Sequence, residues 1–157
     1  MEEFEKSLEE ALKHLRIADH LLYITYPLIK EKKLLLKVLN EIYLALYTTI
    51  NAVLQYESYY KRIHLYQDQR ANFETFIRQC AGKYDLTREQ LAIIVSIFRI
   101  IETRKESPFE FTKKDKIVIM SSDNTSIETI TVEKIKYYLI VTKDFLTKAR
   151  FKIKNKV

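Results

Sequence analysis

The chain has 157 residues, of which 47% are hydrophobic, so it can bury the core of one folded domain and is not a disordered protein. With one glycine and two prolines, it lacks the turn residues that sheet proteins use, and it cannot form a glycine-rich phosphate loop. The net charge of +6 is compatible with RNA or an acidic protein as partner and requires neither.

The first predicted helix runs from about Glu3 to about Tyr26, because apolar residues recur there every three or four positions. Pro27 disfavours helical backbone at the residue before it, so we expect a break or kink at this point. The connection at residues 28–33 is short and charged, which predicts that the next helix returns antiparallel to the first.

The second predicted helix is the centre of the fold and extends from about Leu35 to about Leu65. Its apolar or small residues form an unbroken heptad seam with a second row beside it, so the helix should pack against more than one neighbour. The seam comprises Leu35, Val38, Ile42, Ala45, Thr49, Ala52, Tyr56, Tyr59 and Ile63, and the second row Leu39, Leu46, Val53 and Tyr60.

Two further helices are predicted in the middle of the chain. The third is short, spans about residues 72–81, and should be ended by Gly82 in a left-handed conformation. The fourth begins at a capping box formed by Thr87 and Gln90 and runs to about Lys105. Its inward face should comprise Leu91, Ile94, Val95, Phe98 and Ile101.

Residues 116–130 have a different pattern, in which β-branched and alternating segments flank turn residues, and we expect a small β-hairpin there. Thr131 then caps a last helix that ends near Ala149, and a basic tail follows over about residues 148–157. Residues 1–157 are therefore predicted to form one all-α domain. It is an antiparallel bundle of four main helices plus one short helix, with the hairpin before the last helix.

Several classes of protein are disfavoured by what the sequence lacks. Cys80 is the only cysteine, so we expect no intrachain disulfide, no cysteine-rich zinc site and a reducing, cytoplasmic location. Acidic Glu2 and Glu3 differ from the start of a signal peptide, and no apolar run is long enough to span a membrane. The abundance of lysine, glutamate, isoleucine and tyrosine is typical of thermophile proteins.

The sequence also carries no recognisable catalytic motif. His14 and His20 are six residues apart on one helix and point in different directions, and His64 belongs to another element. We therefore expect no metal and no cofactor, and the sequence favours a protein that is not an enzyme.

The strongest candidate for a binding site is the tyrosine-rich, basic segment at the end of the second helix. Tyrosine rings can stack on bases and the cations can contact phosphates. The candidates there are Tyr60, Lys61, Arg62, His64, Tyr66 and Arg70. The alternative is that the tyrosines complete the core and the cations only solvate the helix end.

Two other basic features could contact the same phosphates. The tail contributes Lys152, Lys154 and Lys156, and the end of the fourth helix contributes Arg99 and Arg104. The alternatives are a frayed basic terminus and ordinary cations at a helix end.

Two segments resemble helices of the HEPN domain family. Residues 7–22 resemble the amphipathic first helix of that family, and residues 42–54, which include the run Asn51-Ala-Val-Leu, resemble its second. The predicted helix from Thr131 to near Ala149 is similar to the last helix of the family.

The resemblance implies an all-α bundle, often dimeric, that binds or cleaves RNA. Active members carry a histidine four to six residues after an arginine, whereas Thr103, Arg104 and Lys105 hold those positions after Arg99, and no histidine follows His64. We therefore expect a cytoplasmic, non-catalytic RNA-associated or ribonucleoprotein-associated module. The alternatives are a protein–protein interaction module, such as a homodimer or antitoxin-like accessory bundle, and a degenerate HEPN ribonuclease.

Overall fold

The computed structural model describes residues 2–106, 109–113, 116–120 and 127–155, and most of them are helical, which confirms the predicted all-α class. The helices are α1 (Glu3–His20), α2 (Tyr26–Ile29), α3 (Lys33–Tyr59), α4 (Gln69–Thr75), α5 (Arg88–Glu106) and α6 (Val132–Lys154). The strands are β1 (Phe109–Lys113), β2 (Lys116–Met120) and β3 (Ile127–Thr131).

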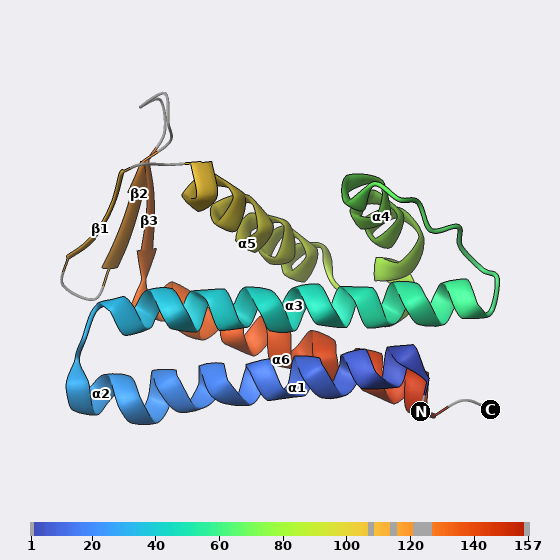
Figure 1. The fold of residues 1–157 in the computed structure, drawn as a ribbon, viewed down its shortest axis with the longest axis horizontal. Coiled ribbons are helices and arrows are strands. Elements are labelled where there is room, and N and C mark those ends of the chain that lie inside the picture. The colour runs from blue at the N-terminus through green and yellow to red at the C-terminus, as the bar shows by residue number, and fades with distance from the viewer. Residues whose placement is uncertain (1, 107–108, 114–115, 121–126, 156–157) are drawn as a thin grey trace.

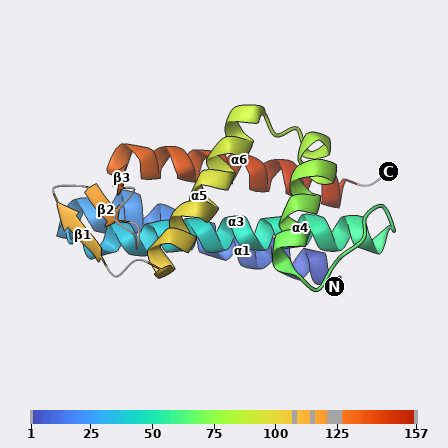
Figure 2. The same ribbon diagram turned by 90° about the horizontal axis from the view of Figure 1, so that it is seen from above.

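The long helices form two layers. Figure 1 shows α1 and α3 side by side with α6 behind them, and α4 and α5 on the opposite side of α3 from α1. Seen from above, α4 and α5 cross over α3 and α6 (Figure 2). Helix α3 therefore packs against α1, α5 and α6, as expected for the central helix of the bundle.

The predicted seam of α3 is buried from Leu35 to Tyr56. Ala45, Thr49 and Ala52 have no exposed surface, and their small side chains allow α1 and α6 to approach closely. The prediction that this helix continues to Leu65 is wrong, because it ends at Tyr59.

A Schellman motif ends α3. Lys61 takes the left-handed conformation with φ 58°, its N–H donates to the Ser58 carbonyl, and the Arg62 N–H donates to the Glu57 carbonyl at 2.9 Å. Tyr59 and Tyr60, predicted to continue the two apolar rows, are 57% and 40% exposed. The apolar pattern in the sequence thus continues beyond the residue at which the helix ends.

A break or kink was predicted at Pro27, but the chain does not break there, because helical backbone continues past it to Ile29. A π-helical turn at Leu21–Thr25 precedes it, in which the Tyr26 N–H donates to the Leu21 carbonyl, and α2 then continues to Ile29. The wider turn accommodates the proline ring, which in a regular α-helix would collide with the carbonyl four residues earlier. Lys30, with φ 55°, ends the segment.

The third helix also differs from its predicted limits. Asp68 caps α4, which begins at Gln69, and the chain continues through a π-helical turn and a 3₁₀ turn as far as Tyr84. The expectation that Gly82 ends it in a left-handed conformation is wrong, because Asp85 takes that position with φ 57°.

The predicted start of α5 is confirmed, since Thr87 and Gln90 exchange capping hydrogen bonds of 3.0 and 3.1 Å. Thr131 likewise accepts a bond from the Lys134 N–H at the start of α6. Helix α6 continues to Lys154, and Ile153 is buried, so most of the predicted tail is helical.

The predicted hairpin is present as β2 and β3, which pair antiparallel; its turn at residues 121–126 lies outside the described residues. A third strand, β1, pairs with the other edge of β2 and was not expected. Ile117, Ile119 and Ile130 bury the sheet against the bundle at the end where α5 finishes and α6 begins (Figure 1). In the described part of the chain, every helix is too short or too polar to cross a membrane.

Candidate functional site

A pocket of about 550 Å³ opens between α3, α4 and the second half of α5. This volume is typical of sites that bind small molecules or single groups of a larger ligand. The described residues that line it are Tyr43, Tyr47, Ile50, Asn51, Leu54, Gln55, Leu65, Gln69, Arg70, Asn72, Phe73, Glu74, Val95, Phe98, Arg99 and Glu102.

Four half-buried aromatic rings form one wall of the pocket. The Phe98 ring lies at the centre, with its centroid 5.2 Å from that of Tyr43 and 4.6 Å from that of Phe73. Tyr47 lies 5.9 Å from Tyr43 and extends the wall along α3. Burial, together with Tyr47 and Glu102, raises the pKa of Tyr43 above its usual value, so its hydroxyl stays protonated.

Two of the four amide side chains that line the pocket hold the surrounding loop in place. Gln69 accepts a bond from the Tyr47 hydroxyl at 2.8 Å, and Asn72 exchanges two hydrogen bonds with the backbone of Tyr66. The side-chain amide of Asn51 forms no hydrogen bond within the described part of the chain and can therefore donate to and accept from a ligand.

Two arginines line the pocket from different helices. Arg70 is exposed in the first turn of α4, and its guanidinium forms no ion pair with a described residue. Arg99 on α5 lies 3.2 Å from Glu128 on β3, but an exposed pair of this kind is weak and can exchange for another anion. Glu74 and Glu102 also line the pocket, and Glu74 pairs with Arg78.

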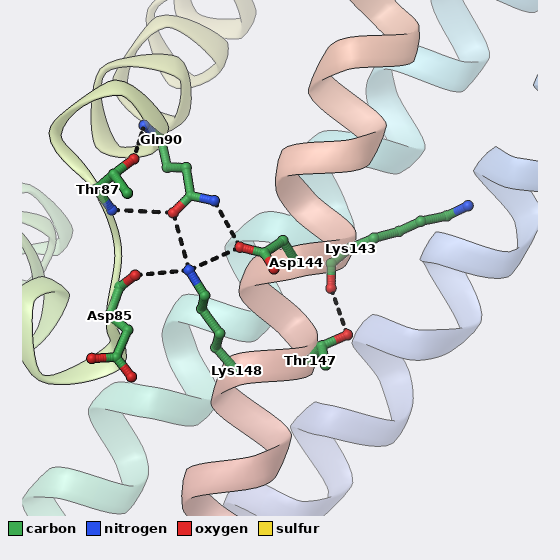
Figure 3. A network of polar contacts seen from close by, with 7 residues as sticks. All are labelled: Asp85, Thr87, Gln90, Lys143, Asp144, Thr147 and Lys148. Carbon is green, nitrogen blue, oxygen red and sulfur yellow. Dashed lines mark hydrogen bonds and ion pairs between the residues drawn. The ribbon is translucent and has the colours of Figure 1, made fainter.

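A polar network joins the start of α5 to α6 (Figure 3). The Lys148 ammonium donates to the Asp85 carbonyl and to Asp144, at 2.7 and 2.9 Å. Gln90 donates to Asp144 at 2.7 Å. The Lys148 hydrogen bond holds the pKa of Asp144 below its usual range, against the opposing effect of burial.

Arg62, one of the predicted phosphate contacts, is occupied within the protein. Its Nε lies 3.2 Å from Oε2 of buried Glu57, and its guanidinium stacks on Tyr56 and Tyr60, 5.5 and 5.1 Å from the ring centroids. That Glu57 oxygen accepts no hydrogen bond from any residue with a described position, so the pair is held by charge alone.

Apart from Arg70, the other predicted residues of this segment do not line the pocket. Lys61 and His64 are exposed in the loop between α3 and α4. The His64 ring packs edge to face on Tyr66, 4.6 Å between centroids. Leu65 from the same loop lines the pocket, so this loop forms one of its borders.

The other predicted cations do not line the pocket. Arg104 lies in the last turn of α5. Lys152 lies over the Tyr84 ring at 5.7 Å, and Lys154 is exposed at the end of α6; both are on the helix behind α3. Lys156 lies outside the described residues.

The pocket also contains residues that the sequence prediction did not single out. Tyr43, Tyr47 and Asn51 recur every four residues and form a row on α3 beside the two predicted apolar rows. That spacing could have identified them. Both Val95 and Phe98 were predicted to face the core; Val95 is exposed in the pocket instead, whereas Phe98 packs against the core and also lines the pocket.

Among the residues with described positions, no group of three or more His, Cys, Asp or Glu side chains is placed to hold a metal ion. Comparison with known protein families, curated proteins and solved structures found no match to this chain. The resemblance to HEPN domains therefore stays a prediction from the sequence.

Proposed function

We propose that this chain is a non-catalytic RNA-associated module that accepts an unpaired base in the pocket between α3, α4 and α5. The observation that carries the proposal is the convergence of Arg70 and Arg99, from separate helices, on one aromatic-lined pocket. Aromatic faces stack on any base, and arginine pairs with phosphate through two parallel hydrogen bonds.

The composition of the pocket supports this ligand class. Base stacking on an aromatic side chain contributes about 1–3 kcal/mol per base, and the Phe98 and Tyr47 rings are only half-buried. The carboxylates of Glu74 and Glu102 repel phosphate, so we expect the RNA backbone to follow the side occupied by Arg70 and Arg99.

The proposal is for binding without cleavage. General acid–base cleavage of RNA commonly uses histidine, and no described residue lining the pocket is a histidine. His14 and His20 lie on α1, on the opposite side of α3 from α4 and α5 (Figure 1). His64 is exposed in the loop between α3 and α4, where its ring packs on Tyr66, and it does not line the pocket.

The test is fluorescence anisotropy with a labelled single-stranded RNA at salt concentrations from about 50 to 200 mM. The logarithm of the binding constant should fall linearly with the logarithm of the salt concentration. Arg70→Ala should weaken binding and make this slope shallower by about one unit, because one phosphate contact is lost. Arg16→Ala, at an exposed position on α1, is the matched control and should leave affinity unchanged. Absent or salt-independent binding would overturn the proposal.

Stacking is tested by Phe98→Leu, which keeps an apolar side chain and removes the ring. We expect affinity to fall about 5- to 100-fold while the urea midpoint of unfolding changes little. Equal RNA affinity for this variant and the wild type would exclude the pocket as the site of the base.

A further inference from the structure

Most of the net positive charge of the chain lies on α6. This helix carries seven basic and two acidic residues. The basic and acidic residues of the rest of the chain nearly cancel, so α6 accounts for most of the net charge of +6. Helix α6 runs along one edge of the molecule, with α3 and α1 on its inner side (Figure 2). The excess charge is therefore presented at one edge, away from the half of α5 that lines the pocket.

The outward face of α6 has the spacing of a helix–helix contact. Tyr137, Ile140, Asp144, Thr147 and Phe151 follow one another at steps of three, four, three and four. At the edge toward α5, the Tyr137 hydroxyl donates to Glu89 and Asp144 accepts from Gln90, so the uncovered apolar side chains of the row are Ile140 and Phe151. Ile140 and Phe151 are 57% and 67% exposed, so no described element covers them. The opposite face of α6 is already packed in the core through Ile135, Leu139, Thr142, Phe145, Leu146, Ala149 and Ile153.

Cations border this strip on the side of α1 and at the C-terminal end of α6. On the side of α1, Lys136 and Lys143 lie 5.9 and 6.0 Å from the ring of Tyr23. Toward the end of the helix, Arg150, Lys152 and Lys154 surround Phe151 in sequence, and Lys154 is exposed. An apolar strip bordered by positive charge is complementary to an amphipathic helix whose flanks are acidic.

We propose that the outward face of α6 docks an acidic amphipathic helix of a partner protein. RNA fits this face less well, because the row between the cations presents the aliphatic side chain of Ile140 and the hydroxyl of Thr147, and neither stacks on a base. Lys143 and Lys148 are paired with Asp19 and Asp144, so the charge that attracts either partner comes mainly from Arg150 and Lys154. The site is separate from the pocket, so the two proposals can fail independently.

The experiment uses the full chain and two synthetic amphipathic peptides of about four heptads with the same apolar residues. One peptide carries glutamate and the other lysine at the flanking positions, and binding is measured by calorimetry. The acidic peptide should bind, and Phe151→Ala or Ile140→Ser should weaken it at least about 10-fold. The basic peptide should not bind.

Two double variants with the same change in net charge distinguish the effect of the charge on α6 from the effect of the overall charge of the protein. Arg150→Glu with Lys154→Glu should abolish binding of the acidic peptide, whereas Lys13→Glu with Arg16→Glu on α1 changes the net charge equally and should not. Equal loss in both double variants, or unchanged binding in Phe151→Ala, would overturn the proposal. So would RNA binding that is lost in the α6 variants and retained in Arg70→Ala, because α6 would then be the RNA face.

Discussion

The Schellman motif at the end of α3 positions a charged pair that the sequence pattern did not predict. Arg62 covers the nearly buried carboxylate of Glu57, whose side chain is 5% exposed. Arg62→Ala removes the compensating charge, and we expect a loss of about 2 kcal/mol in the free energy of unfolding, measured by urea titration.

The control for this pair is a double-mutant cycle. In a Glu57→Gln background there is no buried negative charge to compensate, so Arg62→Ala should cost clearly less than in the wild type. The same cost in both backgrounds would mean that Arg62 acts only through stacking on Tyr56 and Tyr60.

Cys80 is fully buried beside this cluster. Burial, reinforced by Glu57 and opposed by Lys83, raises the pKa of its thiol to about 11, so about one thiol in a thousand is ionised near pH 8. We expect a thiol reagent to react with the native protein far more slowly than with the urea-unfolded chain. Similar rates in the two states would show that the thiol is exposed.

At the scale of the elements, three non-glycine residues among those with described positions end helical segments in the left-handed conformation: Lys30, Lys61 and Asp85. A sequence interpretation assigns that conformation to glycine first, which explains the error at Gly82 and the overextended α3. The capping box of Thr87 with Gln90 and the N-cap at Thr131 were predictable because each depends on residues only three positions apart.

The one glycine is thus in a position that does not need glycine. A methyl group at Gly82 would meet no atom within 4 Å, and the residue does not have a positive φ. Gly82→Ala should raise the free energy of unfolding by about 0.4–1 kcal/mol, because it restricts the unfolded chain. Asp85→Val, at φ 57°, should instead lower it by at least about 1 kcal/mol. Urea titration measures both, and a destabilised Gly82→Ala would contradict this account of the turn.

The network in Figure 3 gives a further prediction, which concerns the start of α5 and its contact with α6. Thr87→Ala removes one capping bond and should cost about 1 kcal/mol. Gln90→Ala also removes the bonds to Asp144 and Lys148, so it should cost more. If urea unfolding shows equal costs, the contact between α5 and α6 does not depend on Gln90.

At the scale of the whole molecule, the sequence predicted the bundle more fully than the site. Heptad spacing identifies the buried seam of α3, because burial follows the helical period. Arg70 and Arg99 line the same pocket only because of how α4 and α5 cross α3, and no local sequence pattern predicts that arrangement. The strand β1 was missed for a related reason, since it gains its hydrogen bonds only by pairing with β2.

The two proposed surfaces would make the chain an adapter. The pocket over α3 would hold RNA, and the outward face of α6 would hold an acidic helix. Because the Gln90 network joins α5 to α6, it connects the element that lines the pocket with the element that carries the docking face.

The most direct test of the central proposal is to locate bound RNA by photocrosslinking. A single-stranded RNA containing 4-thiouridine is irradiated with the full chain, and mass spectrometry identifies the crosslinked residues. We expect crosslinks at Tyr47, Phe73 and Phe98, and their loss when unlabelled RNA competes. Crosslinks at Phe151 on α6, or none that competing RNA removes, would contradict binding of a base in the pocket.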